Sequence, residues 1–291
     1  MNFKNTKELI RLVRPEHSLM LVLAVLAAEL MTRGFPSLLL LLLSLVTPVF
    51  VSMGAFAIND YYDIEVDKAN KKKRPLVIGT VTPRQAVYTT IASMGIGVAA
   101  SALINIYALL IALAFALLAV AYAYKLKELL FWGNAYVALA MVIPFAYGDF
   151  VVSTSLNYNV AIISVMIFLA GLAREIHGTI RDYSGDTAVR NAHTLPKAIG
   201  IKGSALLALL LYLTAIGISV YIAAAVKPFA LNAPYIVLVA VTDVLLLYTS
   251  IGYVFDNNEQ FYEKARNISL LAMAIALIAV LAGAALPSLT F

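Results

Sequence analysis

Residues 37–67 read SLLLLLLSLVTPVFVSMGAFAINDYYDIEVD, an apolar run that passes directly into a cluster of acidic residues. The first part, 37–58, carries no charge and is long enough for a helix to cross about 30 Å of hydrocarbon. Inside a bilayer every backbone N–H and C=O needs an internal partner, which a helix provides. The stretch therefore predicts a transmembrane helix whose acidic continuation lies at the membrane surface.

Apolar runs recur along the whole chain, which has 291 residues, 62% of them hydrophobic and 13% charged. Soluble domains have about 45–50% and about 25%, and the alternative of a large soluble core would show shorter runs. The absence of cysteine excludes disulfides, thiolate metal sites and a cysteine nucleophile. We expect an all-α, polytopic membrane protein. Its nine predicted transmembrane helices cover 18–31, 37–58, 85–104, 106–124, 134–147, 158–173, 203–226, 235–255 and 268–286.

The distribution of Lys and Arg tests this count, because positively charged loops stay in the cytoplasm. With the N-terminus inside and the C-terminus outside, 19 of the 21 basic residues fall in inner segments, and only Arg33 and Lys227 fall outside. A miscounted helix would invert every later loop and destroy this distribution. The charges predict a multi-pass protein of the cell membrane, and they account for the net charge of +5 without a nucleic-acid partner.

Two inner loops together hold seven of the 16 acidic residues of the chain. Residues three, four or seven apart share one face of a helix, so each loop presents several carboxylates on one side. Magnesium binds carboxylate, water and phosphate oxygens, and two such clusters facing one another are suited to hold a diphosphate. The predicted Mg²⁺ ligands are Asn59, Asp60, Asp63, Asp67, Asp182 and Asp186, and the predicted catalytic residues are Asp63, Asp67, Asp182 and Asp186.

Two simpler explanations of these acids stay open. They belong to a solvated loop, or they pair with neighbouring Lys and Arg residues and do nothing more. Neither explains why the cluster occurs twice, with an even number of helices between, which places both on one face of the membrane. The repetition predicts one domain, 1–291, with a pseudo-repeat of four-helix units over 18–130 and 134–255 and a final helix over 268–286.

A metal-bound diphosphate points to cleavage of a carbon–oxygen bond, with the leaving group neutralised by metal and nearby cations. An allylic carbon suits this reaction, because resonance stabilises the carbocation that is left. Its prenyl tail would lie between the helices, open to membrane lipid. The sequence has no Ser-His-acid arrangement and no Gly-rich phosphate loop, which argues against hydrolases and ATP-driven enzymes. The candidate cations are Lys73, Arg74, Lys127 and Arg174.

These motifs resemble the UbiA superfamily of intramembrane prenyltransferases, and the resemblance spans nearly the whole chain. It is carried by Asn59-Asp60-x-x-Asp63-x-x-x-Asp67 with Arg74-Pro75-Leu76, by Asp182-x-x-x-Asp186 with Thr194-Leu195-Pro196, by Tyr122 and Lys127 ahead of Gly133-Asn134, and by Arg14-Pro15. The resemblance implies nine helices around a central cavity, magnesium as cofactor, and transfer of an isoprenoid from its diphosphate to an aromatic ring or a hydroxyl. It adds Arg14 and Tyr122 to the predicted substrate-binding residues.

Within the superfamily the chain looks most like the archaeal branch that joins a geranylgeranyl chain to geranylgeranylglyceryl phosphate for ether lipids. This rests on Asp63-Ile64-Glu65-Val66-Asp67 and on Arg174-Glu175. The alternative acceptor is an aromatic acid or quinone precursor of the 4-hydroxybenzoate type. An alternative from another class is a cation-coupled transporter, but transporters place ionisable groups near the bilayer midplane in broken helices.

Other polar residues have more than one interpretation. His177 and His193 flank the second acidic motif, where each either binds the phosphate of an acceptor or packs in the loop. Tyr122 either contacts the donor or anchors the chain at the interface. Asp243, inside a predicted span, is expected to make a structural hydrogen bond. Thr179 stands where relatives often carry another Asp, so metal binding at the second motif rests on two carboxylates.

Overall fold

The computed structural model describes residues 3–129, 131–183, 194–256 and 258–286, and over these residues the chain is helical with no strand. Its elements are α1 (Phe3–Val13), the 3₁₀ helix η1 (Pro15–His17), α2 (Ser18–Arg33), α3 (Leu38–Tyr62), α4 (Ile64–Ala69), α5 (Pro83–Ala102), α6 (Ile106–Tyr124), the 3₁₀ helix η2 (Leu126–Glu128), α7 (Trp132–Val152), α8 (Tyr158–Arg181), α10 (Leu195–Ala225), α11 (Ala233–Phe255) and α12 (Glu259–Ala285).

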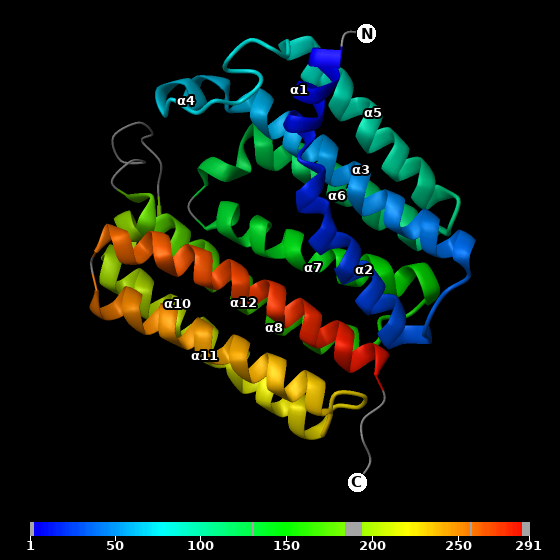
Figure 1. The fold of residues 1–291 in the computed structure, drawn as a ribbon, viewed down its shortest axis with the longest axis vertical. Coiled ribbons are helices and arrows are strands. Elements are labelled where there is room, and N and C mark those ends of the chain that lie inside the picture. The colour runs from blue at the N-terminus through cyan, green and yellow to red at the C-terminus, as the bar shows by residue number, and fades with distance from the viewer. Residues whose placement is uncertain (1–2, 130, 184–193, 257, 287–291) are drawn as a thin grey trace.

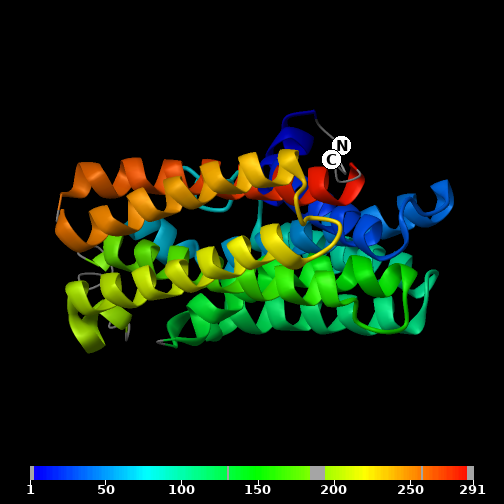
Figure 2. The same cartoon turned by 90° about the horizontal axis from the view of Figure 1, so that it is seen from below.

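The long helices lie side by side in one flattened bundle (Figures 1 and 2). Most pack on their neighbours in sequence: α3 on α5, α6 on α7, α7 on α8, α8 on α10, and α11 on both α10 and α12. Helix α12 returns to α2, so that the last long helix closes on the first. Helix α2 also packs on α7.

Seven of the described helices are long and apolar enough to cross a membrane: α3, α6, α7, α8, α10, α11 and α12. Their most apolar segments are only 28–44% buried inside the bundle, so their outer faces are covered with exposed apolar side chains. Such a surface needs lipid around it. The chain is therefore a multi-pass membrane protein. Helix α2 has 16 residues, and α5 carries several polar side chains, so these two do not meet the same criteria.

All nine predicted segments coincide with helices, and three helices extend furthest beyond the predicted bounds. Helix α8 continues past 173 to Arg181, α12 begins at Glu259 before 268, and α10 begins at Leu195 before 203. The extensions contain polar residues, so a prediction from hydropathy ends each helix before them. The extensions nevertheless bury apolar residues such as Ile176, Ile180 and Ala265. Packing therefore continues the helices beyond the apolar runs.

The first acidic motif and the described part of the second, up to Asp182, lie at one end of the bundle. Helix α3 with α4 and helix α8 end on the same side in Figures 1 and 2, where α11 also ends and α12 begins. Helix directions alternate along the chain, so an even number of helices between α3 and α8 puts Asp63 and Asp182 at the same end of the bundle.

Small residues allow close contact between α3 and α5, which support the first motif. A Cβ on Gly54 would lie 2.5 Å from Met94, and one on Gly97 would lie 2.8 Å from Val51. The close approach lets the Thr47 hydroxyl donate to the Gly97 carbonyl at 2.9 Å. Glycine contacts with interhelical hydrogen bonds are a usual way to pack helices in a bilayer, where lipid competes for apolar contacts.

Candidate active site

Asp60, in the last turn of α3, holds two arginines. Its carboxylate is 1% exposed. Nη2 of Arg14 donates to both carboxylate oxygens at 2.6 and 2.7 Å, and Nη1 of Arg74 donates to Oδ1 at 2.5 Å. Arg14 has a left-handed backbone (φ 47°) between α1 and η1, a conformation that needs support from its surroundings. The Asp60 contact provides it.

Asp67, in α4, is 2% exposed and shares Arg74 with Asp60. Its Oδ2 lies 2.9 Å from Arg74 Nη1, and its Oδ1 lies 3.1 Å from Lys72 Nζ. Asp60, Asp63 and Asp67 were predicted to share one helical face, and the structure brings only Asp60 and Asp67 to one guanidinium, because α3 ends at Tyr62 and α4 begins at Ile64. Buried Leu76 and Val81 anchor the segment that follows Arg74.

Asp63 lies at the junction between α3 and α4 and faces a different cation. Its Oδ1 accepts from Lys127 Nζ at 2.8 Å, and its Oδ2 accepts from Asn59 Nδ2 at 3.1 Å. Lys127 belongs to η2, whose backbone is close to Gly133 in α7: a Cβ there would lie 3.3 Å from Lys127 Cα. Glycine at that position lets α7 begin against η2 and so places Lys127 beside Asp63.

At the second motif the acids also carry basic partners. Arg174 Nη1 donates to Glu175 Oε1 at 2.8 Å, and Arg181 donates to both oxygens of Asp182 at 2.7 and 2.9 Å. Asp182 caps α8, which ends at Arg181, and the Thr179 hydroxyl donates to the backbone of Ile176. Asp186 and His193 lie outside the described residues.

The pairing of acids with bases, one of the simpler explanations considered above, is thus present at both motifs. Within the described part of the chain, no group of three or more His, Asp or Glu side chains is arranged to hold a metal ion. At the first motif, Asn59 Oδ1 is buried and has no hydrogen-bond partner among the described residues, although Asn59 Nδ2 donates to Asp63. An oxygen ligand next to a carboxylate fits a hard cation such as Mg²⁺.

The other predicted substrate-binding residues lie in three places. Lys73 is exposed, and its carbonyl accepts from Arg11. Tyr122 is half-buried in α6 and stacks on Tyr136 with ring centroids 4.4 Å apart. His177 is 4% exposed and stacks on Tyr253 at 3.9 Å, nearly parallel. His177 lines the same pocket as Asp182 of the second motif. Lys73 and Tyr122 do not line that pocket.

His177 belongs to a polar pocket of about 260 Å³ at the end of α8. Helices α11 and α12 supply lining residues that the sequence did not predict. Arg181, seven residues after Arg174 and so on the same helical face, had a local signal. Tyr253, Arg266 and Ser269 come from helices distant in sequence and had no local signal. Glu175, which was quoted beside Arg174 and not assigned a role, also lines the pocket; the other unpredicted polar lining residues are Arg181, Tyr253, Arg266 and Ser269.

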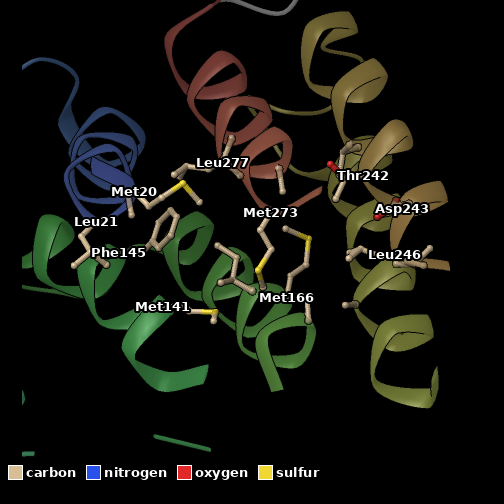
Figure 3. A pocket seen from close by; sticks show the side chains of 18 residues that line it. Met20, Leu21, Met141, Phe145, Met166, Thr242, Asp243, Leu246, Met273 and Leu277 are labelled. Carbon is tan, nitrogen blue, oxygen red and sulfur yellow. The ribbon is translucent and has the colours of Figure 1, made fainter. Parts of the chain in front are cut away.

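Next to the polar pocket, toward the middle of the bundle, lies an apolar chamber of about 140 Å³ between α2, α7, α8, α10, α11 and α12 (Figure 3). Asp243 is one of its few polar lining residues and accepts a hydrogen bond from Ser219 at 2.5 Å, which confirms the predicted structural hydrogen bond. Four methionines line it: Met20, Met141, Met166 and Met273.

The sequence matches the model of the UbiA prenyltransferase family over residues 19–271. A digeranylgeranylglyceryl phosphate synthase of Archaeoglobus fulgidus is 39% identical over 275 residues, which cover 94% of each chain. A structure from a study of digeranylgeranylglyceryl phosphate synthase in membranes has a TM-score of 0.80 at 26% identity, covering 97% of this chain and 99% of that chain. A UbiA homologue from A. fulgidus bound to GPP and Mg²⁺ has a TM-score of 0.67 at 21% identity, with 94% and 99% covered, and so shares the fold.

Proposed function

The chain belongs to the UbiA prenyltransferase family, and we propose that it transfers a geranylgeranyl group from its diphosphate to geranylgeranylglyceryl phosphate, in archaeal ether-lipid synthesis. The observation that carries the proposal is that the first acidic motif and Asp182 of the second lie at one end of a bundle whose interior holds an apolar chamber. This arrangement suits a substrate with a diphosphate head and a prenyl tail. The relative that is 39% identical, named for this product, supports the choice of acceptor.

We assign the Mg²⁺ ligands to Asn59, Asp63 and Asp67 in the first motif and to Asp182 and Asp186 in the second. The unused oxygen of Asn59 supports this assignment. Magnesium, when bound, would neutralise charge on the diphosphate. Asp60, predicted as a further ligand, already binds Arg14 and Arg74 with its two oxygens, and we propose that it positions these guanidiniums.

The basic residues would then act on the leaving group. Three cations pair with carboxylates of the first motif: Lys127, Arg74 and Lys72. When these carboxylates bind metal, the three cations are free to turn toward the diphosphate. Arg14, Arg174 and Lys73 complete the proposed set. The allylic C–O bond breaks, the electron pair stays on the diphosphate, and the acceptor hydroxyl oxygen bonds to the carbocation and loses its proton.

The proposal includes a topology. We infer that α2 and α5 cross the membrane with the seven more apolar helices, which gives nine spans, an inner N-terminus, an outer C-terminus and an active site open to the cytoplasm. The 19 basic residues on the inner side support this orientation. The chain then forms one domain with a pseudo-repeat over 18–130 and 134–255, each half carrying an acidic motif after its second span.

The test is product identity. Purified enzyme in detergent is given labelled geranylgeranyl diphosphate, Mg²⁺ and either geranylgeranylglyceryl phosphate or 4-hydroxybenzoate. We expect digeranylgeranylglyceryl phosphate and release of diphosphate with no gradient present. Prenylated 4-hydroxybenzoate would assign the aromatic acceptor instead, and the absence of any diphosphate release would favour transport.

A further inference from the structure

Arg74 lies on a segment without regular secondary structure, residues 70–82, between α4 and α5. The backbone of this segment is left-handed at Lys71 and at Gly79, with φ of 52° and 76°. A lysine adopts that conformation only where its surroundings support it. Helical hydrogen bonds therefore do not fix the Arg74 segment, and its contacts with other elements decide where the guanidinium lies.

Helix α1 supplies polar contacts of this kind. It packs on α3 at the end of the bundle that carries the first motif (Figure 1). Arg11 Nη2 donates to the Lys73 carbonyl oxygen at 2.8 Å, and this carbonyl belongs to the peptide group that joins Lys73 to Arg74. Glu8 Oε2 accepts from Thr80 Oγ1 at 3.0 Å. Helix α1 is therefore bonded to the segment on both sides of Arg74.

An apolar contact between α1 and the same segment accompanies the polar ones. Leu12 is fully buried and belongs to one cluster with Leu76 and Val81 of the segment. Positions 8, 11 and 12 share one face of a helix, so a single side of α1 makes both kinds of contact. Burial of Leu12 fixes α1 against the segment, and the two polar side chains then fix the register between them.

We propose that Arg11 is a positioning residue for donor binding: it holds the Lys73–Arg74 peptide group so that the Arg74 guanidinium stays beside the carboxylates of the first motif. The inference rests on the proposed function, in which Arg74 acts on the diphosphate of the donor. A segment that is already ordered loses less conformational freedom when the donor binds, and the donor therefore binds more tightly. Arg11 acts through the backbone and does not itself contact the donor.

The first test is steady-state kinetics of the full-length enzyme in detergent, with geranylgeranyl diphosphate, Mg²⁺ and geranylgeranylglyceryl phosphate. We expect Arg11→Met, which keeps the apolar stem and removes the donor, to raise the KM for the diphosphate about fivefold. The KM for the acceptor should stay within about twofold. A variant that is merely less stable has less folded enzyme, which lowers the apparent kcat and leaves both KM values unchanged. Arg11→Lys keeps a charged donor and should restore the KM for the diphosphate to within about twofold of wild type.

The second test is coupling to Arg74, measured as equilibrium binding of labelled geranylgeranyl diphosphate with Mg²⁺. In an Arg74→Gln background, Arg11→Met should change the Kd by less than about twofold, because the residue that it positions is already replaced. Lys7→Met is the matched control: Lys7 is an exposed cation one turn before Arg11, and its loss should leave the Kd within about twofold. Glu8→Ala, which removes the contact with the other side of the segment, is the second variant should Arg11→Met fold poorly.

Three results would overturn the inference. The first is wild-type donor KM and Kd in folded Arg11→Met and Glu8→Ala. The second is an equal loss of affinity in Lys7→Met, and the third is an Arg11→Met effect that persists in full in the Arg74→Gln background. Absence of any transfer from geranylgeranyl diphosphate by the wild-type enzyme would instead contradict the proposed function.

Discussion

Both carboxylate oxygens of Asp60 accept hydrogen bonds from Nη2 of Arg14, 46 residues away in sequence, at 2.6 and 2.7 Å. The contact ties the segment that precedes the first long helix to the last turn of α3. Arg74 approaches the same carboxylate from the segment that follows α4. One buried carboxylate therefore fixes the position of two arginines beside the predicted diphosphate site.

Removal of this carboxylate should destabilise the protein. Asp60→Ala leaves Arg14, 22% exposed, without a carboxylate partner, and it leaves Arg74, 23% exposed, with Asp67 alone. Breaking a buried pair costs about 3–5 kcal/mol, and the partial exposure reduces our expectation to about 2–3 kcal/mol. Thermal unfolding in detergent measures the effect.

The control is Glu65→Ala in the same motif, because the Glu65–Lys68 pair is exposed (83% and 51%) and should contribute less than about 1 kcal/mol. Equal melting temperatures for the two variants would show that Asp60 does not hold the arginines.

Metal removal should abolish transfer without unfolding the protein. Without bound metal, Asp63 is still paired with Lys127, and Asp67 is still paired with Arg74 and Lys72. Neither carboxylate is therefore left without a positively charged partner. We expect EDTA to stop product formation, Mg²⁺ to restore it, and the melting temperature to stay within about 5 °C. Undiminished turnover in EDTA would exclude the metal, and unfolding in EDTA would contradict the pairing.

The contact between α2 and α7 requires glycine at 148. A Cβ at Gly148 would lie 2.5 Å from the Val25 carbonyl oxygen, so Gly148→Ala should cost about 1–3 kcal/mol by overpacking. A Cβ at Gly217, in α10, would meet nothing within 4 Å, and Gly217→Ala should be neutral or stabilise by about 0.5–1 kcal/mol. A thermal melt of both variants is the measurement, and similar shifts would argue against close packing of α2 and α7.

The inferred orientation predicts which residues react from each side of the membrane. The chain has no cysteine, so Lys125→Cys and Lys227→Cys each introduce one thiol. A membrane-impermeant maleimide applied to intact cells should label the thiol at position 227 and not the one at 125, and inverted vesicles should show the reverse. Labelling of both positions from one side would refute the inferred topology.

Hydropathy and charge predicted where the helices lie, because a long uncharged segment in a bilayer can satisfy its backbone hydrogen bonds only as a helix. They underestimated α8, α10 and α12, since the extensions are polar in sequence and are helical through packing of residues such as Ile176, Ile180 and Ala265. Helical spacing predicted one face for Asp60, Asp63 and Asp67, which holds for Asp60 and Asp67 and is wrong for Asp63.

Spacing did not predict the partners. Asp63 turns to Lys127 because the backbone changes direction between α3 and α4, and no local pattern reports that junction. Tyr253 and Arg266 reach the second motif from helices that are distant from it in sequence, so only the tertiary fold reveals them. The spacing of seven residues between Arg174 and Arg181 on α8 could have predicted that both face the same pocket.

The most direct test of the central claim is a double-mutant cycle on donor binding. Geranylgeranyl diphosphate affinity is measured with and without Mg²⁺ in the wild type, Asp63→Ala, Asp182→Ala and the double variant. If both motifs hold one metal-bound diphosphate, Mg²⁺ should strengthen wild-type binding by about tenfold or more, each single variant should lose that gain, and the double variant should lose little further. Independent, additive losses, or a full Mg²⁺ gain in Asp182→Ala, would contradict a shared site.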